Sequence, residues 1–260
     1  MSCCNDSQKV HEQVRDRYGE IARQSGKGGG GCCDVAEATC STGLGYTAQE
    51  LATLPAGADL GLGSGHPVAA AALKPGETVL DLGSGAGIDC LLAARQVGPG
   101  GRVIGVDMTP DMVEAARANV RKAGAENVTI HEGQIERLPI EDASVDVVIS
   151  NCVVNLSPDK PAVWREVYRV LRPGGRVVIS DVVATKPLPA AVRDRPELLC
   201  GCVSGAASFE ELERWLAETG FVEVRLEPAE RQARPVTQWL EGDTSGAEVL
   251  STMIHARKAR

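Results

Sequence analysis

The sequence predicts an α/β protein built on a Rossmann-like sheet, a mostly parallel β-sheet with helices on both faces. From residue 77 onward, short apolar runs rich in β-branched residues alternate with stretches of helical periodicity. Strands that alternate with helices of about 10–15 residues form parallel sheets covered on both faces. A chain of 260 residues is also long enough to bury one large core without disulfide bonds.

We divide the chain into three parts. A helical segment with a loop rich in glycine and cysteine comes first, and a main α/β domain follows it. A proline-rich stretch at 186–189 then leads into a small α+β region, which we expect to contribute to the substrate site and to complete the sheet. The bounds of the three parts are residues 1–60, 61–185 and 186–260.

The N-terminal segment contains two expected helices with a loop between them. Apolar residues at helical spacing predict a helix over 11–24. The glycine run 26–31 is too flexible to hold regular structure, and it leads directly into Cys32 and Cys33. A capping box that starts at Thr47 predicts a second, short helix. The loop therefore presents two adjacent thiols.

The main domain begins with a buried strand and then alternates helices with strands. Thr109 and Pro110 mark one helix start, because threonine favours the N-cap and proline the first helical position. In such sheets, ligands bind at the carboxyl ends of the strands. The expected strands cover 78–82, 102–107, 128–132, 145–150 and 176–182, and the expected helices cover 87–97, 110–123 and 160–171.

The C-terminal region adds one helix and two strands. Ser208 is the expected N-cap of a helix over 209–219. Alternating residues in 221–226 and 247–255 predict two strands that pair as an antiparallel edge of the sheet. Cys202 lies before this helix in a glycine-rich stretch. The region is therefore expected to bring a thiol to the edge of the sheet.

The composition excludes several classes of partner. The net charge of −8 argues against a nucleic-acid backbone, and three Trp, three Tyr and two Phe leave few side chains for stacking on bases. No apolar run approaches the roughly 18 residues of a membrane span, and the first residues contain no hydrophobic signal segment. We therefore expect a cytoplasmic protein that binds neither nucleic acid nor a membrane.

A glycine-rich loop joins the first strand to its helix. Gly83, Gly85 and Gly87 allow a tight turn and let a ligand approach the backbone, while the helix N-terminus favours an anion. Asp107 ends the next strand and is placed to bind ribose hydroxyls. Asp81 is expected near a cationic amine. The GxGxG spacing departs from the dinucleotide motif, so the loop fits S-adenosylmethionine better than NAD.

A second glycine-rich stretch, 59–65, has almost the same sequence as this loop. No β-branched run precedes it, so nothing predicts a strand before the turn. We therefore expect that this stretch is not the cofactor loop.

The order of these motifs resembles that of class I methyltransferases over roughly residues 65–185. In that class, the stretch after the third strand, here Ile135 and Glu136, places the adenine. Asn151 follows the fourth strand, at the catalytic edge of the sheet. The resemblance implies a Rossmann-like class I methyltransferase sheet. The expected cofactor-binding residues are Asp81, Gly83, Ser84, Gly85, Gly87, Asp107, Met108, Ile135, Glu136 and Asn151.

The cysteines are the unusual feature of the composition. There are nine, an odd number, so they cannot all pair within the chain, and a reducing cytosol keeps most thiols free. Cys152 comes directly after the fourth strand, and Cys202 is able to fold over the same edge. Cys32 or Cys33 can join them, whereas Cys90 is expected only to pack. Converging thiolates would select a soft acceptor.

Zinc is the alternative occupant of such a thiol cluster. The chain has no CxxC pair, which most structural zinc sites use. We interpret each histidine as an ordinary surface or packing residue, because the four are scattered singly. They are His11, His66, His131 and His255.

Several stretches match the arsenite S-adenosylmethionine methyltransferases. They are 81–90 (DLGSGAGIDC), 106–109 (VDMT), 151–160 (NCVVNLSPDK), 168–175 (YRVLRPGG) and 201–206 (GCVSGA). The chain thus resembles this family over most of its length. The resemblance implies that Cys152 and Cys202 bind trivalent arsenic. It also implies that an N-terminal cysteine, here Cys32 or Cys33, forms a disulfide with another cysteine during turnover and takes part in binding inorganic arsenite.

One position departs from the family pattern. Members often carry a cysteine where this chain has Ser64, within the stretch 61–65 (GLGSG). A serine can neither act as a thiolate nor form a disulfide. Two interpretations stay open. Either Cys32 and Cys33 compensate, or two thiols suffice and the preferred substrate is an already methylated trivalent arsenic species.

The expected reaction is a direct displacement. Arsenic held by Cys152 and Cys202 attacks the methyl group of S-adenosylmethionine with its lone pair, so no general base is needed. The expected partners are arsenite or a methylated trivalent arsenic species and a thiol reductant of the thioredoxin or glutathione type, and the protein is expected to be a monomer. Two alternatives are a C- or O-methyltransferase for a small, quinone-like acceptor and a non-catalytic metalloid-binding protein.

Overall fold

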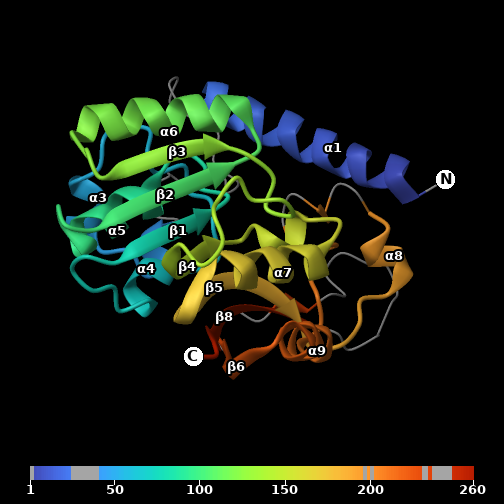
Figure 1. Ribbon diagram of the computed structural model, residues 1–260. Coiled ribbons are helices and arrows are strands. Elements are labelled where there is room, and N and C mark those ends of the chain that lie inside the picture. The colour runs from blue at the N-terminus through green and yellow to red at the C-terminus, as the bar shows by residue number, and fades with distance from the viewer. Residues whose placement is uncertain (1–2, 25–40, 196–197, 200–201, 230–233, 236–247) are drawn as a thin grey trace.

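The computed structural model (Figure 1) describes most of the chain. The described residues are 3–24, 41–195, 198–199, 202–229, 234–235 and 248–260, with the side chains of 3–6 and 234–235 left out. The predicted loop with Cys32 and Cys33 lies outside these residues. No helix within the described ranges is both long and apolar enough to cross a membrane.

One mixed β-sheet forms the centre of the molecule. Its strands lie in the order β3-β2-β1-β4-β5-β8-β6, and β7 pairs with β8. The pairs among β1 to β5 are parallel, whereas β8 is antiparallel to both β5 and β6. The predicted α/β fold and antiparallel edge are therefore confirmed. The strands are β1 (Thr78–Leu82), β2 (Arg102–Asp107), β3 (Val128–Glu132), β4 (Val145–Asn151), β5 (Leu171–Ala184), β6 (Phe221–Pro228), β7 (Arg234–Pro235) and β8 (Glu248–Lys258).

Helices cover both faces of the sheet. One face packs on α7 and α9, and the other packs on α4, α5 and α6, while α1 lies along α6 (Figure 1). The helices are α1 (Cys3–Gln24), α3 (Ala48–Ala52), α4 (Pro67–Ala70), α5 (Ile88–Val97), α6 (Pro110–Ala123), α7 (Lys160–Val170), α8 (Ala190–Arg193) and α9 (Phe209–Thr219), with a 3₁₀ turn, η1 (Val154–Leu156).

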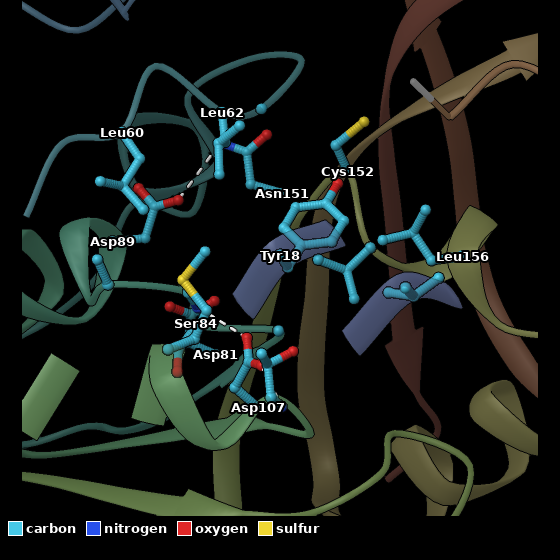
Figure 2. Close-up of a pocket in the computed structure, with 18 of the residues that line it drawn as sticks. Tyr18, Leu60, Leu62, Asp81, Ser84, Asp89, Asp107, Asn151, Cys152 and Leu156 are labelled. Carbon is cyan, nitrogen blue, oxygen red and sulfur yellow. Dashed lines mark hydrogen bonds between the residues drawn. The ribbon is translucent and has the colours of Figure 1, made fainter. Parts of the chain in front are cut away.

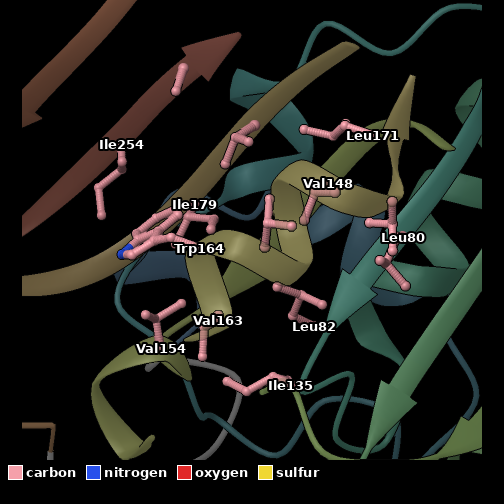
Figure 3. Packing of buried hydrophobic residues seen from close by; sticks show 14 of the residues in the cluster. Leu80, Leu82, Ile135, Val148, Val154, Val163, Trp164, Leu171, Ile179 and Ile254 are labelled. Carbon is pink, nitrogen blue, oxygen red and sulfur yellow. The ribbon is translucent and has the colours of Figure 1, made fainter. Parts of the chain in front are cut away.

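The alternation of side chains along each strand produces two cores. On β1, Leu80 and Leu82 point to the face where Trp164 is fully buried (Figure 3), while Val79 points to the opposite face and packs with Leu92. Successive strand residues point to opposite faces, so an apolar run without polar alternation belongs in a sheet covered on both sides.

The structure changes two predicted boundaries. The first helix starts at Cys3 rather than at residue 11, because polar residues continue the helix before its apolar face begins. The fifth strand starts at Leu171 rather than at residue 176. The turn expected at the proline and glycines instead forms an irregularity within the strand, where the pairing shifts between Val145 and Val147. The three-part division of the chain stays a prediction.

Candidate active site

A cavity of about 620 Å³ opens at the carboxyl ends of the parallel strands. This size suits a small organic ligand, and the position is the one where α/β sheets bind their ligands. In Figure 2, Asp81, Ser84 and Asp107 lie on one side of the cavity and Cys152 lies on the other. One cavity therefore joins the predicted cofactor loop to a predicted thiol.

The loop after β1 approaches its surroundings closely. Gly83 has a φ of +65°, and a Cβ atom there would lie 2.4 Å from a methyl carbon of Val153, so only glycine fits. The hydroxyl of Ser84 is buried at the cavity wall and has no hydrogen-bond partner among the described residues. A buried, unpartnered hydroxyl that lines a cavity is a contact point for a ligand.

Asp107 is fixed by the backbone around it. Its Oδ2 accepts a hydrogen bond of 3.0 Å from the backbone N–H of Gly85, and its Oδ1 accepts one of 2.8 Å from that of Thr109. Burial raises the pKa of the carboxyl, and these backbone donors oppose the shift. The side chain lines the cavity in a set orientation, as expected for a group that binds hydroxyls.

Two further buried acids lie beside Asp107. Burial raises the pKa of Asp81 well above its usual value, and the nearby charges of Asp89 and Asp107 add to the shift. Burial also raises the pKa of Asp89 to about 6, against the effect of hydrogen bonds from Tyr46 and Asn151. All three carboxyls line the cavity, so its wall favours a cationic ligand group. Sequence reasoning missed Asp89.

Asn151 holds the second glycine-rich stretch in place. Its Oδ1 accepts from the backbone N–H of Ser64 at 2.8 Å, and its Nδ2 donates to the carbonyl oxygen of Gly65 at 2.8 Å. A Cβ atom at Gly63 would lie 2.8 Å from the same Oδ1. The stretch follows no strand, as expected, yet it lines the cavity opposite the first loop. Asn151 was predicted to bind the cofactor, and its amide is occupied by protein groups.

The cavity has a third wall near the predicted adenine position. Ile135, Glu136 and Met108 all line it, as does α1 through His11. The Nε2 atom of His11 lies 3.1 Å from Oε1 of Glu136. His11 was interpreted as a surface or packing residue, so its place at the cavity is a correction. No sequence signal links α1 to this wall, because the contact joins distant parts of the chain.

Gly87 is a predicted cofactor residue that does not line the cavity. It is the N-cap of α5, with a φ of +95° that favours glycine. Its role in the structure is to turn the chain from the loop into the helix.

Two cysteines from separate parts of the chain meet at the cavity. Cys152 follows β4 and is half-buried, and Cys202 comes before α9 and is buried. The thiol of Cys202 donates to the carbonyl oxygen of Cys152 at 3.2 Å. Both residues have a φ of +58°, an uncommon left-handed conformation for a residue with a side chain. Such strain often occurs at functional sites.

Asp181 lies beside the two thiols, and sequence reasoning missed it. The sulfur atoms of Cys152 and Cys202 and a carboxylate oxygen of Asp181 all lie within 4.8 Å of one another. Burial raises the pKa of Asp181 to about 6, while backbone donors and the nearby charge of Lys160 oppose the shift. The available signal was an acid within the mostly apolar second half of strand β5, residues 177–184.

Comparison with known proteins identifies the family. A family model for a methyltransferase domain matches residues 73–220. The arsenite methyltransferase of Halobacterium salinarum is 51% identical over 97% of this chain and 68% of its own length. The chain belongs to the arsenite methyltransferase family. The predicted resemblance is therefore confirmed.

Other members of the arsenite methyltransferase family are less similar. That of Aquipseudomonas alcaligenes is 37% identical over 84% of this chain and 63% of its own length, so this chain spans about two thirds of these relatives. The crystal structure of an arsenic(III) S-adenosylmethionine methyltransferase from Chlamydomonas reinhardtii is 34% identical, covers 85% of this chain and 73% of its own, and has a TM-score of 0.64. A phosphoethanolamine N-methyltransferase from Haemonchus contortus, at 21% identity and a TM-score of 0.60, shares the fold.

The remaining cysteine of the main domain behaves differently from the pair at the cavity. Cys90 is fully buried in the core, and its thiol donates to Oδ2 of Asp81 at 3.2 Å. Burial raises the pKa of this thiol well above its usual value, and Asp81 adds to the shift. In this member of the arsenite methyltransferase family, Cys90 packs, as expected, and also orients a cavity carboxyl.

Proposed function

We propose that the protein transfers a methyl group from S-adenosylmethionine to trivalent arsenic held by Cys152 and Cys202. The observation that carries this proposal is the meeting of two thiols from distant segments at one wall of the cavity that the loop of Asp81 and Gly83 also lines. The named activities of the similar proteins from H. salinarum and C. reinhardtii support the same substrate and cofactor. The role is arsenic detoxification.

The residues of the cavity fit S-adenosylmethionine. The unpartnered hydroxyl of Ser84 and the close-packed Gly83 leave a polar backbone turn for the amino-acid carboxylate. Asp81 and Asp89 suit the positive charges of the amine and the sulfonium. Asp107 binds the ribose hydroxyls. When bound, the cofactor would supply a methyl group activated by its sulfonium; the arsenic lone pair would donate to the methyl carbon as the bond from sulfur to that carbon breaks and S-adenosylhomocysteine leaves.

Ile135, Glu136 and Met108 surround the adenine end of the cofactor in this proposal. They line the wall that α1 covers, and Glu136 is held by His11 and by the hydroxyl of Ser157. A wall with one apolar and one polar side can receive a flat ring and still offer a hydrogen bond to its edge. The roles of these residues rest on their places around the cavity.

The protein's part in the reaction is to hold arsenic trivalent, electron-rich and near the methyl group. Each thiol of Cys152 and Cys202 replaces one hydroxyl of arsenous acid, and the S–H proton leaves with that hydroxyl as water. The arsenic lone pair stays free, so the nucleophile has no proton to lose and no general base is required. Orientation of two reactants can lower a barrier by about 7–11 kcal/mol.

Within this proposal, the number of thiols that bind arsenic determines which arsenic species the protein accepts. Ser64 lines the cavity, and its hydroxyl lies 3.0 Å from that of Ser180, so this position offers no thiol. Two thiols suffice for a methylated trivalent arsenic species. For inorganic arsenite, Cys32 or Cys33 completes the set and later forms a disulfide.

The proposal includes a reductant, a compartment and an assembly state. Free thiols require a reducing environment, which the cytoplasm supplies with reductants of the thioredoxin or glutathione type. Among the described residues, Val222 is the one large apolar side chain that is exposed. A surface with so little exposed apolar area supports a monomer.

Replacing Cys152 tests the proposed function. We expect Cys152→Ser to reduce arsenic methylation at least a hundredfold, because one of two arsenic ligands is lost. Binding of S-adenosylhomocysteine, measured by calorimetry, is expected to stay within about twofold. Cys4→Ser removes a thiol of the N-terminal segment and serves as the matched control. A Cys152→Ser protein that methylates arsenite at the normal rate would contradict the proposal.

A further inference from the structure

A third potential ligand, the carboxylate of Asp181, lies beside the two thiols at the cavity. The proposed binding of arsenic by the thiols does not require this carboxylate. Cys152, Asp181 and Cys202 come from the end of β4, from β5 and from the segment before α9. Their ligand atoms lie within 4.8 Å of one another, and two of the three residues are buried. We propose that these three residues form a zinc site, which Zn²⁺ occupies in competition with the arsenic substrate.

The donor set matches the preferences of zinc. Zn²⁺ binds thiolate sulfur at about 2.3 Å and carboxylate oxygen at about 2.0–2.2 Å in tetrahedral geometry. Such bonds place the ligand atoms of one site roughly 3.6–3.8 Å apart. The three donors here need to move by about an ångström at most to meet that spacing. Trivalent arsenic, in contrast, is a soft acceptor that takes the two thiols and has little affinity for a carboxylate.

Hydrogen bonds from the residues around it orient the carboxylate of Asp181. Oδ1 of Asp181 accepts from Nδ2 of Asn155 at 2.9 Å and from the backbone N–H of Val182 at 2.8 Å. Its Oδ2 accepts from the backbone N–H of Asn155 at 3.2 Å. Metal-binding carboxylates are typically held in this way, and the outer partners tune metal affinity. Asp181 is thus preorganised beside the thiols rather than free to rotate.

The backbone holds the two cysteines close together. The segment of Cys202 packs so tightly on η1 that a Cβ atom at Gly205 would lie 2.1 Å from the carbonyl oxygen of Asn155. The N–H of Cys152 donates to the carbonyl oxygen of Ser180 at 2.7 Å, which ties it to β5. The ligands therefore sit on fixed elements, as a metal site with defined geometry requires.

The charges around the site balance with zinc bound. Two thiolates and the carboxylate of Asp181 carry three negative charges, and the buried Lys160 interacts with both Asp181 and Cys202. Its Nζ atom donates to the carbonyl oxygen of Ser157 at 3.0 Å, which holds the ammonium group nearby. Zn²⁺ and this ammonium together neutralise the three ligands, and a buried cluster of charges is stable only when it is compensated.

Zinc binding releases protons from the two thiols. Zn²⁺ displaces the two S–H protons of Cys152 and Cys202 to solvent, while Asp181 binds as a carboxylate. Three protein ligands leave a fourth position for water. Zinc and trivalent arsenic cannot share the two sulfur atoms. Zn²⁺ therefore blocks the methyl-acceptor site and also keeps the adjacent thiols from oxidising to a disulfide.

The test measures zinc binding in a reduced full-length parent with few thiols. In this parent, serine replaces the cysteines whose side chains the structure does not describe, which are Cys3, Cys4, Cys32, Cys33, Cys40 and Cys200. Zn²⁺ affinity is measured against a coloured chelator, without arsenic or S-adenosylmethionine. We expect one equivalent of Zn²⁺ per chain and at least tenfold weaker binding after Asp181→Asn. Asp142→Asn changes an exposed carboxylate and is the matched control.

A spectroscopic measurement keeps the proposal testable if Asp181→Asn fails to fold. Co²⁺ bound to the parent is expected to show an absorption band from thiolate-to-metal charge transfer. Cys202→Ser is expected to reduce the intensity of this band by about half. X-ray absorption of the zinc-loaded parent is expected to show two sulfur ligands with the others nitrogen or oxygen. One equivalent of methylarsenite, for which two thiols suffice, is expected to displace the zinc. Absence of stoichiometric zinc, unchanged affinity in Asp181→Asn, or a shell of three sulfurs would overturn the site. Methylation activity is a separate measurement, so either proposal can fail without the other.

Discussion

Acidic side chains at the two ends of the parallel strands experience opposite electrostatic environments. Near the amino ends, two partly buried acids, Glu77 and Glu166, each pair with an arginine. Glu77 accepts two hydrogen bonds from Arg176, at 2.6 and 2.9 Å, and Glu166 accepts two from Arg169, both at 2.7 Å. Burial raises the pKa of Glu77, yet the hydrogen bonds outweigh it and lower the pKa overall. These acids stabilise the fold as carboxylates.

At the carboxyl ends, buried acids have no such partner among the described hydrogen bonds. Asp81, Asp89, Asp107 and Asp181 accept from backbone, hydroxyl, amide or thiol groups, and burial raises the pKa of each. Keeping them charged costs folding free energy. The difference shows that the paired acids at the amino ends contribute to stability, whereas the acids at the carboxyl ends have no arginine partner among the described hydrogen bonds and suit cationic ligands.

The pH dependence of stability is the strongest way to test this comparison. The pKa of Asp89 is raised to about 6, so the folded state keeps a proton that the unfolded state releases near pH 4. The contribution of Asp89 to stability is therefore present at low pH and lost as pH rises from about 4 to 6. Between pH 4 and 7, wild type is expected to lose about 2 kcal/mol relative to Asp89→Asn. Urea unfolding of both proteins measures this, and parallel pH profiles would refute it.

Cofactor affinity tests the second half of the comparison. Asp107→Asn keeps the shape of the side chain but removes the charge that we propose binds the ribose hydroxyls, and hydrogen bonds to charged groups are worth about 1.5–3 kcal/mol. We expect the affinity for S-adenosylhomocysteine, measured by calorimetry, to fall about thirtyfold. Asp146→Asn, at the amino end of β4, serves as the control because its carboxylate pairs with Arg172. Equal losses in both variants would remove the distinction between the two ends.

Local signals explain which parts of the structure the sequence predicts. The capping box at Thr47 and the N-cap at Ser208 formed as expected, because an N-cap and its partner lie within one turn. The strands β1, β2 and β3 match their predicted bounds, since buried apolar runs between turns are unambiguous. The roles of the cofactor-binding and thiol residues stay predictions. Nearly all of these residues that the structure describes line one cavity.

The features that sequence reasoning missed depend on contacts between distant segments. Asp181 becomes a neighbour of Cys152 only when β4 pairs with β5, and His11 reaches Glu136 only when α1 folds along α6. The second glycine-rich stretch lines the cavity because Asn151 holds it there. No periodicity or spacing within one segment encodes these contacts, so a motif search cannot find them.

The smallest expected effect on the free energy of unfolding comes from an acid at the amino ends of the strands. Its dependence on pH runs in the opposite direction to that of Asp89. Glu77→Gln removes the charge that Arg176 binds and leaves a partly buried guanidinium without its carboxylate. Solvent screening limits the loss to about 1 kcal/mol of unfolding free energy at pH 7. The pKa of Glu77 is lowered, so its contribution is present above its unfolded pKa and lost as pH falls through its folded pKa. Urea unfolding is therefore expected to show a difference between wild type and Glu77→Gln that shrinks toward pH 3. A difference that grew on acidification would place Glu77 with the acids of the carboxyl ends.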